Sequence, residues 1–369
     1  MEKYIFVLGN NPELSLAEIK AVYQNLILLK QGSDFAIFEG EKIDCQKAQV
    51  RLGGTIKIGK VIGEKLDERL ILKNIIEAPK SGKVKFGFSW YETERKNKFG
   101  LVIKGLLKSK NIQSRFVESK DSKLSSVIVA KEKCLDFLIL PDIVGLTCAV
   151  QDFRGFSDRD YGRPKSDSLS GMLPPKLARI MVNLSGADFT SFILDPFCGS
   201  GTILTEAVSL GYRNLKGSDI SNKAVDDSAN NTQWLIERLG IKKIDLEVFS
   251  CDSTEISQKI AKENISSIIT EPFLGRPIKG SETEFDIKKI ISQLKDLYLR
   301  SFKEFKKILQ KKGKVVIVFP QWHVKDKIFE MGIEKEVEDL GFVRLDKGNL
   351  IYKRNDQKVW RKILIYEKK

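Results

Sequence analysis

The sequence predicts an α/β protein whose second half forms a doubly wound parallel sheet. Short apolar runs that look like strands recur there, and a helical pattern of a dozen or more residues separates each run from the next. Such alternation implies right-handed βαβ crossovers. A glycine-rich loop follows the first of these strands, at the edge where open parallel sheets bind ligands.

The first half alternates short strands with amphipathic helices, which is typical of an α+β arrangement. A helix follows the first strand, and Ser15 and Glu18 match the capping-box pattern expected at its start. Further helices are predicted over residues 66–78 and near 101–107, where apolar residues recur at helical spacing. The expected strands are the segments 4–9, 34–40, 55–62, 83–91, 115–119, 125–131 and 135–140.

Residues 154–173 are rich in Gly, Pro, Ser and charge and have little periodicity, so they are predicted to be a linker. The domain after it, residues 174–369, contains the parallel sheet. Its tail, residues 342–354 and 358–369, is predicted to form an antiparallel hairpin at the sheet edge. The expected parallel strands are 192–197, 214–220, 244–252, 266–272 and 314–320.

The charge of the chain favours a polyanionic partner. The 369 residues carry a formal net charge of +14, and the excess of basic residues is shared equally by residues 1–170 and 171–369. No window approaches the roughly 18 uninterrupted apolar residues of a membrane span. The N-terminus does not resemble a secretion signal, so we expect a cytoplasmic protein with no membrane association.

The cysteines and the single histidine predict no metal site. The cysteines show no CxxC spacing and are odd in number, which favours free thiols over a zinc site or a disulfide framework. His323, beside Trp322, is expected to be structural. The cysteines are Cys45, Cys134, Cys148, Cys198 and Cys251.

The glycine-rich loop, LDPFCGSGT at residues 194–202, indicates which ligand binds at the edge of the sheet. Gly199 and Gly201 allow a tight turn, and the helix after them presents free N-terminal amides. Asp195 at the strand end would repel a phosphate but would pair with a cationic amino group. A ligand with both an ammonium and a carboxylate fits this loop, and S-adenosylmethionine is such a ligand.

Two more aspartates end the next two strands. Asp219 is placed to accept the ribose hydroxyls, and Asp252 is placed to accept the adenine amino group. Either one taken alone is equally well explained as a helix N-cap. The predicted cofactor-binding residues are Asp195, Phe197, Cys198, Gly199, Ser200, Gly201, Asp219, Ile220, Asp252 and Ser253.

These stretches resemble those of a known family. LDPFCGSGT, GSDI and DSLSGMLPPKLARIMVNLSG, with LGNNPELSLAEIKAV and IQSRFVESKDSKLSSVIVAK in the first half, are similar to THUMP-containing tRNA guanine-N(2) methyltransferases, in the archaeal and eukaryotic branch that acts at tRNA position 10. The resemblance implies a Rossmann-like class I methyltransferase domain with S-adenosylmethionine as cofactor. It also implies an N-terminal ferredoxin-like segment at 1–60 and a THUMP domain at 61–153.

The resemblance further implies that tRNA is the partner and that the THUMP domain holds its 3′ acceptor end. Basic and aromatic side chains in the matching segment are suited to contact phosphates and a terminal base. The predicted RNA-binding residues are Arg115, Phe116, Lys120 and Lys123.

The catalytic residues are expected where the fourth strand ends, in EPFLG. In the resembling family this position carries Asp or Asn, then Pro-Pro and an aromatic; the side chain and the next carbonyl accept the N–H bonds of the target amine, and the aromatic stacks on the flipped base. Here the candidates are Glu271, Pro272 and Phe273. No strong base is required, because the amine can lose its proton after attack.

The departure from the family pattern leaves alternatives open. The extra methylene of Glu271 moves its carboxylate by roughly one bond length, and misplacement by about 1 Å can cost on the order of a hundredfold in rate. The leading prediction is a tRNA guanine-N(2) methyltransferase. The alternatives are a methyltransferase acting on an rRNA or DNA amine, and a non-catalytic tRNA-binding homologue; the THUMP-like half argues against DNA.

Overall fold

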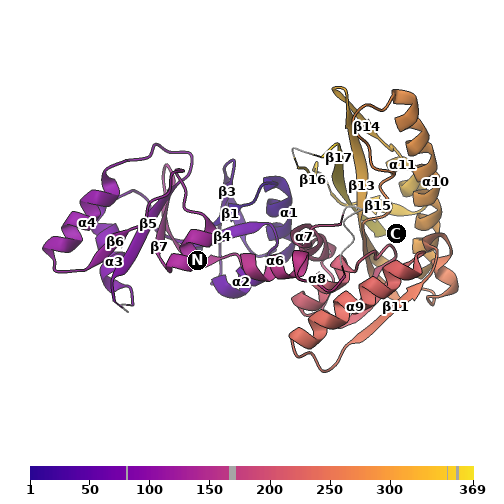
Figure 1. Ribbon diagram of the computed structural model, residues 1–369, viewed down its shortest axis with the longest axis horizontal. Coiled ribbons are helices and arrows are strands. Elements are labelled where there is room, and N and C mark those ends of the chain that lie inside the picture. The colour runs from indigo at the N-terminus through magenta and orange to yellow at the C-terminus, as the bar shows by residue number, and fades with distance from the viewer. Residues whose placement is uncertain (80–81, 166–171, 347, 355–356) are drawn as a thin grey trace. The chain divides into compact units, whose positions relative to one another are not determined.

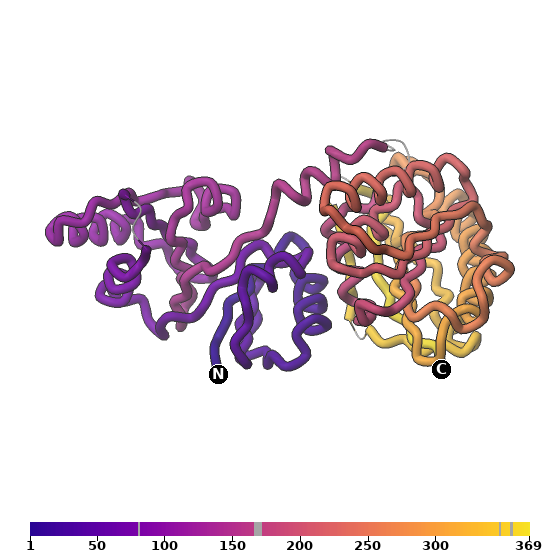
Figure 2. Tube along the Cα trace, turned by 90° about the horizontal axis from the view of Figure 1, so that it is seen from below, coloured from indigo at the N-terminus to yellow at the C-terminus, as the bar shows by residue number. Residues whose placement is uncertain are grey.

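The computed structural model describes residues 1–79, 82–165, 172–346, 348–354 and 357–369. The chain divides into two compact units: unit 1 comprises residues 1–16 and 23–154, and unit 2 comprises residues 17–22 and 155–369. Figure 2 traces the chain from unit 1, coloured indigo to magenta, into unit 2, which ends in yellow. Within the described part of the chain, no helix is both long enough and apolar enough to cross a membrane.

Unit 1 contains one eight-stranded mixed sheet with the strand order β2-β3-β1-β4-β8-β7-β5-β6 (Figure 1). β1 pairs antiparallel with β3 and β4, whereas β5 pairs parallel with β6 and β7. The strands are β1 (Glu2–Leu8), β2 (Ile27–Gln31), β3 (Phe35–Gly40), β4 (Thr55–Gly63), β5 (Val84–Trp90), β6 (Ser114–Phe116), β7 (Leu135–Ile139) and β8 (Val144–Val150). The helices that begin in this part of the chain are α1 (Pro12–Val22), α2 (Cys45–Arg51), α3 (Glu68–Glu77), α4 (Phe99–Ser109) and α5 (Ser126–Glu132).

A buried ion pair lies inside this sheet. Lys57 on β4 and Asp136 on β7 are 2.6 Å apart, and the side chains are 2% and 0% exposed. Ser89 on β5 donates to Asp136 at 2.7 Å, and Thr147 on β8 donates to the same carboxylate at 3.1 Å. Buried charges are tolerated when they are paired and hydrogen-bonded. Polar side chains from four strands meet here and satisfy the carboxylate of Asp136.

Two local predictions in the first half were wrong. α1 begins at Pro12, a residue well suited to the first helical position, so Ser15 and Glu18 lie inside the helix and do not form its capping box. Ser15 instead donates to the carbonyl of Gly54 at 2.8 Å. Residues 125–131 were expected to be a strand, but α5 occupies them because the Ser125 side chain caps a helix by accepting from the Ile128 amide.

The expectation that the cysteines are free thiols is wrong for two of them. Cys45 on α2 and Cys148 on β8 form a disulfide that spans 103 residues of sequence, with their Cα atoms 6.0 Å apart. Spacing along the chain reveals only local cysteine pairs, whereas this pair is created by the packing of α2 on the sheet. Cys134, Cys198 and Cys251 are free.

Unit 2 contains a nine-stranded sheet whose main path is β11-β10-β9-β12-β13-β17-β15 (Figure 1). The first five strands of this path pair in parallel, and β17 pairs antiparallel with both β13 and β15. The predicted doubly wound sheet with an antiparallel C-terminal pair is therefore confirmed. The strands are β9 (Phe192–Asp195), β10 (Asn214–Asp219), β11 (Asp245–Ser250), β12 (Ile265–Thr270), β13 (Leu309–Val324), β14 (Lys327–Glu330), β15 (Phe342–Arg344), β16 (Ile351–Tyr352) and β17 (Val359–Lys368).

The helices of unit 2 pack through long apolar stripes. In α10, buried residues recur at helical spacing from Ile287 through Leu294 and Tyr298 to Phe305, and they pack in one core with strand residues such as Val315. Each fully buried side chain of this kind contributes about 1.5–3 kcal/mol to stability. The helical elements are α6 (Phe153–Tyr161), α7 (Pro175–Ser185), α8 (Thr202–Leu210), α9 (Asn222–Arg238), the 3₁₀ helix η1 (Ser253–Gln258), α10 (Glu284–Ile308) and α11 (Glu334–Asp339).

The segment predicted to be a linker, residues 154–173, contains most of helix α6, while its residues 166–171 lie outside the described part of the chain. Arg159 on α6 and Arg179 on α7 both bind the buried carboxylate of Glu206 on α8, at 2.5 and 2.7 Å. The sequence showed the polar composition of this segment but not the carboxylate that orders it.

Candidate active site

The candidate site lies where the parallel strands β9, β10, β11 and β12 end. Because these strands run in the same direction, the residues that follow them share one edge of the sheet. Asp195 and Asp219 are the last residues of β9 and β10, Glu271 comes directly after β12, and Asp252 is the second residue after β11. The topology therefore places the carboxylates that were predicted from four separate stretches of sequence at the same edge.

The glycine-rich loop between β9 and α8 leaves room for a ligand. Gly199 has a φ of 50°, and a Cβ built there would meet nothing within 4 Å. Gly201, with a φ of 81°, has no such freedom, since a Cβ would lie 2.6 Å from the hydroxyl of Ser228. Gly201 is also the N-cap of α8 and offers no side chain, so the N-terminal amides of this nine-residue helix remain available for an anion.

A neighbouring side chain fixes this loop. The Asn231 amide on α9 donates to the carbonyl of Ser200 at 2.8 Å and to the carbonyl of Lys165 at 2.9 Å. Its oxygen accepts from the backbone of Lys165 at 2.9 Å. Asn231 therefore links the backbone of Lys165 to the glycine-rich loop.

Asp195 is a buried carboxylate that is poorly compensated within the described structure. It is 2% exposed, and Thr270 Oγ1 at 2.7 Å and the amide of Phe197 at 3.2 Å both donate to its Oδ1. Burial raises the pKa of Asp195 to about 7, despite the two hydrogen bonds that favour its charged form. A cation placed against this carboxylate would restore its charge, as expected for a residue that binds an ammonium group.

Asp219 and Asp252 form local hydrogen bonds at the ends of β10 and β11. The carboxylate of Asp219 accepts from the amides of Gly199 and Ser221, both at 3.0 Å, so it links the second strand to the glycine-rich loop. Asp252 accepts from the amide and hydroxyl of Thr254, both at 2.8 Å, and is the N-cap of η1. The N-cap role considered for Asp252 is thus observed, and its contact with adenine stays a prediction.

The other predicted cofactor residues lie in the glycine-rich loop or follow β10 and β11. Ile220 is 73% exposed and offers an apolar surface beside Asp219. Cys198 is buried, and burial raises the pKa of its thiol well above the usual range. Ser253 is buried and its hydroxyl lies 2.9 Å from that of Ser301. Phe197 and Ser200 are partly buried.

The residues present fit S-adenosylmethionine. Asp195 suits the ammonium group, the open amides of α8 suit the carboxylate, and the space over Gly199 admits a ligand against the backbone. No group of three or more metal-ligating side chains occurs among the described residues.

Glu271, the first predicted catalytic residue, is ion-paired with a residue that the sequence analysis did not identify. Arg361 on β17 donates from Nε to Oε1 at 2.5 Å and from Nη2 to Oε2 at 3.4 Å. The side chains of Glu271 and Arg361 are 13% and 7% exposed. Burial raises the pKa of Glu271 above its usual value, and the charge and hydrogen bonds of Arg361 act in the opposite direction.

The two residues after Glu271 differ in exposure. Pro272 is buried, while the side chain of Phe273 is 59% exposed. The hydroxyl of the buried Tyr298 lies 3.3 Å from the carbonyl of Phe273 and 3.3 Å from that of Val318. The Tyr298 hydroxyl therefore contacts the backbone of this turn while the aromatic ring of Phe273 stays accessible.

His323 is a packing residue of β13. Its ring lies against Trp360 with centroids 3.6 Å apart, and its Nε2 is 2.8 Å from the side-chain oxygen of Gln321. Desolvation lowers the pKa of His323 from its usual value, which favours the neutral ring.

The residues predicted to bind RNA fall into two groups in unit 1. Arg115 and Lys120 are exposed, and Arg115 lies 3.4 Å from Glu132. Lys123 forms an ion pair with Asp34 and lies over the ring of Tyr91. Phe116, in contrast, packs into the core of unit 1 through neighbouring aromatic rings, so its ring is used for packing.

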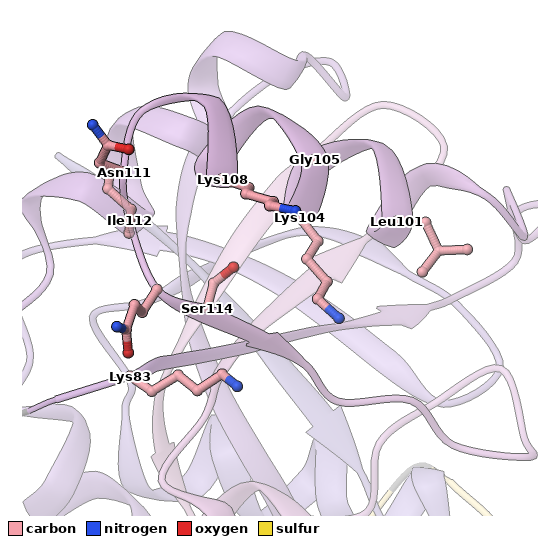
Figure 3. A pocket seen from close by; sticks show the side chains of 9 residues that line it. Lys83, Leu101, Lys104, Gly105, Lys108, Asn111, Ile112 and Ser114 are labelled. Carbon is pink, nitrogen blue, oxygen red and sulfur yellow. The ribbon is translucent and has the colours of Figure 1, made fainter.

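A basic hollow beside α4 was not singled out from the sequence. Its volume is about 620 Å³, and Figure 3 shows Lys104 and Lys108 extending from α4, with Lys83 on the opposite side and Ser114 between them. The sequence signal was present, because the lysines at 104 and 108 are four residues apart and share a helix face. The lining residues are Lys83, Leu101, Lys104, Gly105, Lys108, Asn111, Ile112, Gln113 and Ser114.

The chain is similar to proteins of known class. Residues 163–347, half of the chain, match the family described as RMKL-like, methyltransferase domain. The tRNA (guanine(10)-N2)-dimethyltransferase of Methanothermobacter thermautotrophicus is 29% identical over 74% of this chain and 78% of its own length. The enzyme of the same name from Pyrococcus abyssi is 28% identical over 86% of this chain and 88% of its own.

A solved structure shares the fold. The crystal structure of TrmN from Thermus thermophilus matches with a TM-score of 0.58 and 14% identity, and the match covers 100% of both chains. The structural match confirms the predicted fold class, and the family match assigns the chain to the methyltransferases that use S-adenosylmethionine as cofactor. The chain belongs to the RMKL-like methyltransferase family, and the sheet of unit 2 with its glycine-rich loop is the methyltransferase domain.

Proposed function

We propose that this protein transfers a methyl group from S-adenosylmethionine to the exocyclic 2-amino group of guanosine 10 in tRNA. The observation that carries the proposal is the match to two archaeal enzymes named tRNA (guanine(10)-N2)-dimethyltransferase, which extends over 74% and 86% of the chain. The chain's net charge of +14 supports a nucleic-acid substrate. A tRNA substrate also agrees with the cytoplasmic location expected from the sequence.

The residues of the glycine-rich edge have separate tasks in this proposal. Asp195 binds the ammonium of the cofactor, and the free amides of α8 bind its carboxylate. Asp219 accepts the ribose hydroxyls and Asp252 the adenine amino group. S-adenosylmethionine supplies an activated methyl group, so the chain's own residues only have to position the amine and exclude water.

At the end of β12, Glu271 accepts one N–H of the target amine and the carbonyl of Pro272 accepts the other. The exposed ring of Phe273 stacks on the base that carries the amine. These contacts hold the nitrogen lone pair toward the methyl group. The amine loses its extra proton to water after attack, which agrees with a chain whose single histidine packs against Trp360.

Unit 1 is proposed to bind the RNA. Residues 1–60 correspond to the ferredoxin-like segment and residues 61–153 to the THUMP domain, which holds the 3′ acceptor end. Arg115 and Lys120 are exposed, and the basic hollow beside α4 adds Lys104 and Lys108 to the cationic surface available to phosphates. The full chain should bind intact tRNA more tightly than tRNA without its unpaired 3′ end, and both affinities should fall as salt rises.

The activity is tested with two tRNA transcripts that differ only in guanosine or adenosine at position 10. Each is incubated with the protein and S-adenosylmethionine, and its nucleosides are then identified by mass spectrometry. N(2)-methylguanosine or its dimethyl form should come only from the guanosine transcript. Methylation elsewhere in the transcripts, or methylation of rRNA or DNA alone, would contradict the proposal.

One observation favours a second candidate, a non-catalytic tRNA-binding homologue. Arg361 already occupies both carboxylate oxygens of Glu271 in the structure, at 2.5 and 3.4 Å. A protein of this kind would bind tRNA and methylate neither transcript, so the same experiment distinguishes the two functions.

A further inference from the structure

We propose that Arg361 is a positioning residue that keeps the end of β12 electrically neutral toward the methyl donor. Glu271 and Arg361 then act as one unit, and removing the carboxylate alone exposes a buried cation beside the cofactor. The inference rests on the methyl transfer proposed above for one of its two readouts; the other readout is binding of the cofactor and requires no RNA.

The geometry of the pair supports this role. The guanidinium of Arg361 lies across both oxygens of Glu271 as a fork, the arrangement that best fits a carboxylate. Its third nitrogen, Nη1, is held by the side chain of Gln357 at 3.3 Å. With Arg361 6% exposed, water contributes little to solvating either charge, so each depends on the other for stabilisation.

Glu271 interacts electrostatically with groups on three other elements. Arg361 on β17 pairs with it. Burial, together with the charge of Glu271, raises the pKa of Asp195 on β9 and of Tyr298 on α10. The charges of Glu271 and Arg361 cancel each other, so Asp195 is the neighbouring carboxylate that can pair with a cationic ligand. Neutralising Glu271 would reverse this arrangement, because the positive charge of Arg361 would remain without its partner.

The chemistry of the cofactor makes this change measurable. S-adenosylmethionine carries a fixed positive charge on its sulfur, whereas S-adenosylhomocysteine has a neutral thioether and is otherwise nearly identical. An unbalanced cation at this edge of the sheet should weaken binding of the sulfonium by about tenfold and leave binding of the thioether unaffected. The ratio of the two affinities therefore reports the local charge, and general structural damage lowers both affinities together.

The experiment is calorimetry of both ligands with the wild type, Glu271→Gln, Arg361→Gln and the double variant. Glu271→Gln should lower the preference for S-adenosylmethionine by about tenfold, and adding Arg361→Gln should restore it to within about twofold. Arg361→Gln alone should not lower the preference. An unchanged ratio in Glu271→Gln, no restoration in the double variant, or a fall in Arg361→Gln would each overturn the inference.

A matched control is Arg344→Gln. Arg344 on β15 also donates two hydrogen bonds to a carboxylate, from Nε and Nη2 to Oδ2 of Asp346 at 2.9 and 2.6 Å, but its strand lies beyond β17 in the sheet. This variant should leave the affinity ratio at the wild-type value. If Glu271→Gln does not fold, a fall of the preference for S-adenosylmethionine in Arg361→Gln would still overturn the inference.

The second readout is single-turnover methylation of tRNA. Arg361→Lys keeps the positive charge but loses the fork, so it should keep the affinity ratio and lower the rate at saturating cofactor. An unchanged rate would refute the positioning role. If the wild type methylates no tRNA, the proposed function fails, while the calorimetric arms still test the charge balance on their own.

Discussion

Two groups of buried charges, one in each unit, show how a structural site differs from a candidate ligand site. Asp136 in unit 1 accepts from Lys57, Ser89 and Thr147, and its side chain is fully buried. Asp195 in unit 2 is also buried, but only two donors among the described residues reach it, and burial raises its pKa to about 7. The first carboxylate is satisfied by its own protein, whereas the second is stabilised best when a cation arrives.

The largest expected effect is the loss of stability when the buried ion pair of Asp136 is broken. Asp136→Ala leaves the ammonium of Lys57 buried without its partner, which should lower the free energy of unfolding by about 3–5 kcal/mol. Denaturant unfolding followed by circular dichroism measures this change. A loss below about 1 kcal/mol would show that the pair behaves as a surface salt bridge, and the comparison would then fail.

A second prediction concerns cofactor affinity. Asp219→Ala removes a carboxylate assigned to the ribose and should weaken S-adenosylmethionine binding by about 1.5–3 kcal/mol, the range for hydrogen bonds to a charged group. Asp226→Ala, on the exposed part of α9, is the matched control and should bind normally. Unchanged affinity in a folded Asp219→Ala variant would remove this residue from the site.

The smallest expected effect is a gain in stability, and it tests the difference between Asp136 and Asp195. The folded-state pKa of Asp195 is about 7 and its unfolded value is about 3.9. Between these values the folded protein holds a proton that the unfolded chain has released, so stability falls as pH rises through this interval. Asp195→Asn has no such proton to lose and should be more stable than the wild type at pH 8, by roughly 1–3 kcal/mol.

Unfolding curves at pH 4 and pH 8 measure this difference, which should nearly vanish at pH 4. The same variant should lose cofactor affinity at pH 8, because its amide cannot pair with an ammonium group. A variant that is less stable than the wild type at pH 8 would mean that Asp195 is a structural carboxylate like Asp136.

The parts of this molecule that the sequence predicted are those encoded locally. The parallel strands of unit 2 appear as short apolar runs. The loop could be recognised from its glycines, because Gly199 and Gly201 both have a positive φ, which favours glycine. The first catalytic candidate was likewise identified from its place at a strand end.

The parts that the sequence did not predict depend on residues far apart in the chain. Glu271 and Arg361 are separated by 90 positions, and Cys45 and Cys148 by 103, so no local pattern connects either pair. Arg361 is one of several charged residues of β17, so no pattern in the strand singles it out, and only the sheet order brings it to Glu271. The start of α1 was misplaced because Ser15 fits a cap pattern, while Pro12 begins the helix.

The central claim is that the end of β12 is where methyl transfer takes place. Single-turnover methylation of tRNA, at saturating cofactor, tests it with the wild type, Glu271→Ala and Phe273→Ala. Glu271→Ala should slow the reaction by on the order of a hundredfold while still binding tRNA. Phe273→Ala should weaken base binding by about 1–3 kcal/mol. Methylation by Glu271→Ala at the wild-type rate would contradict the account.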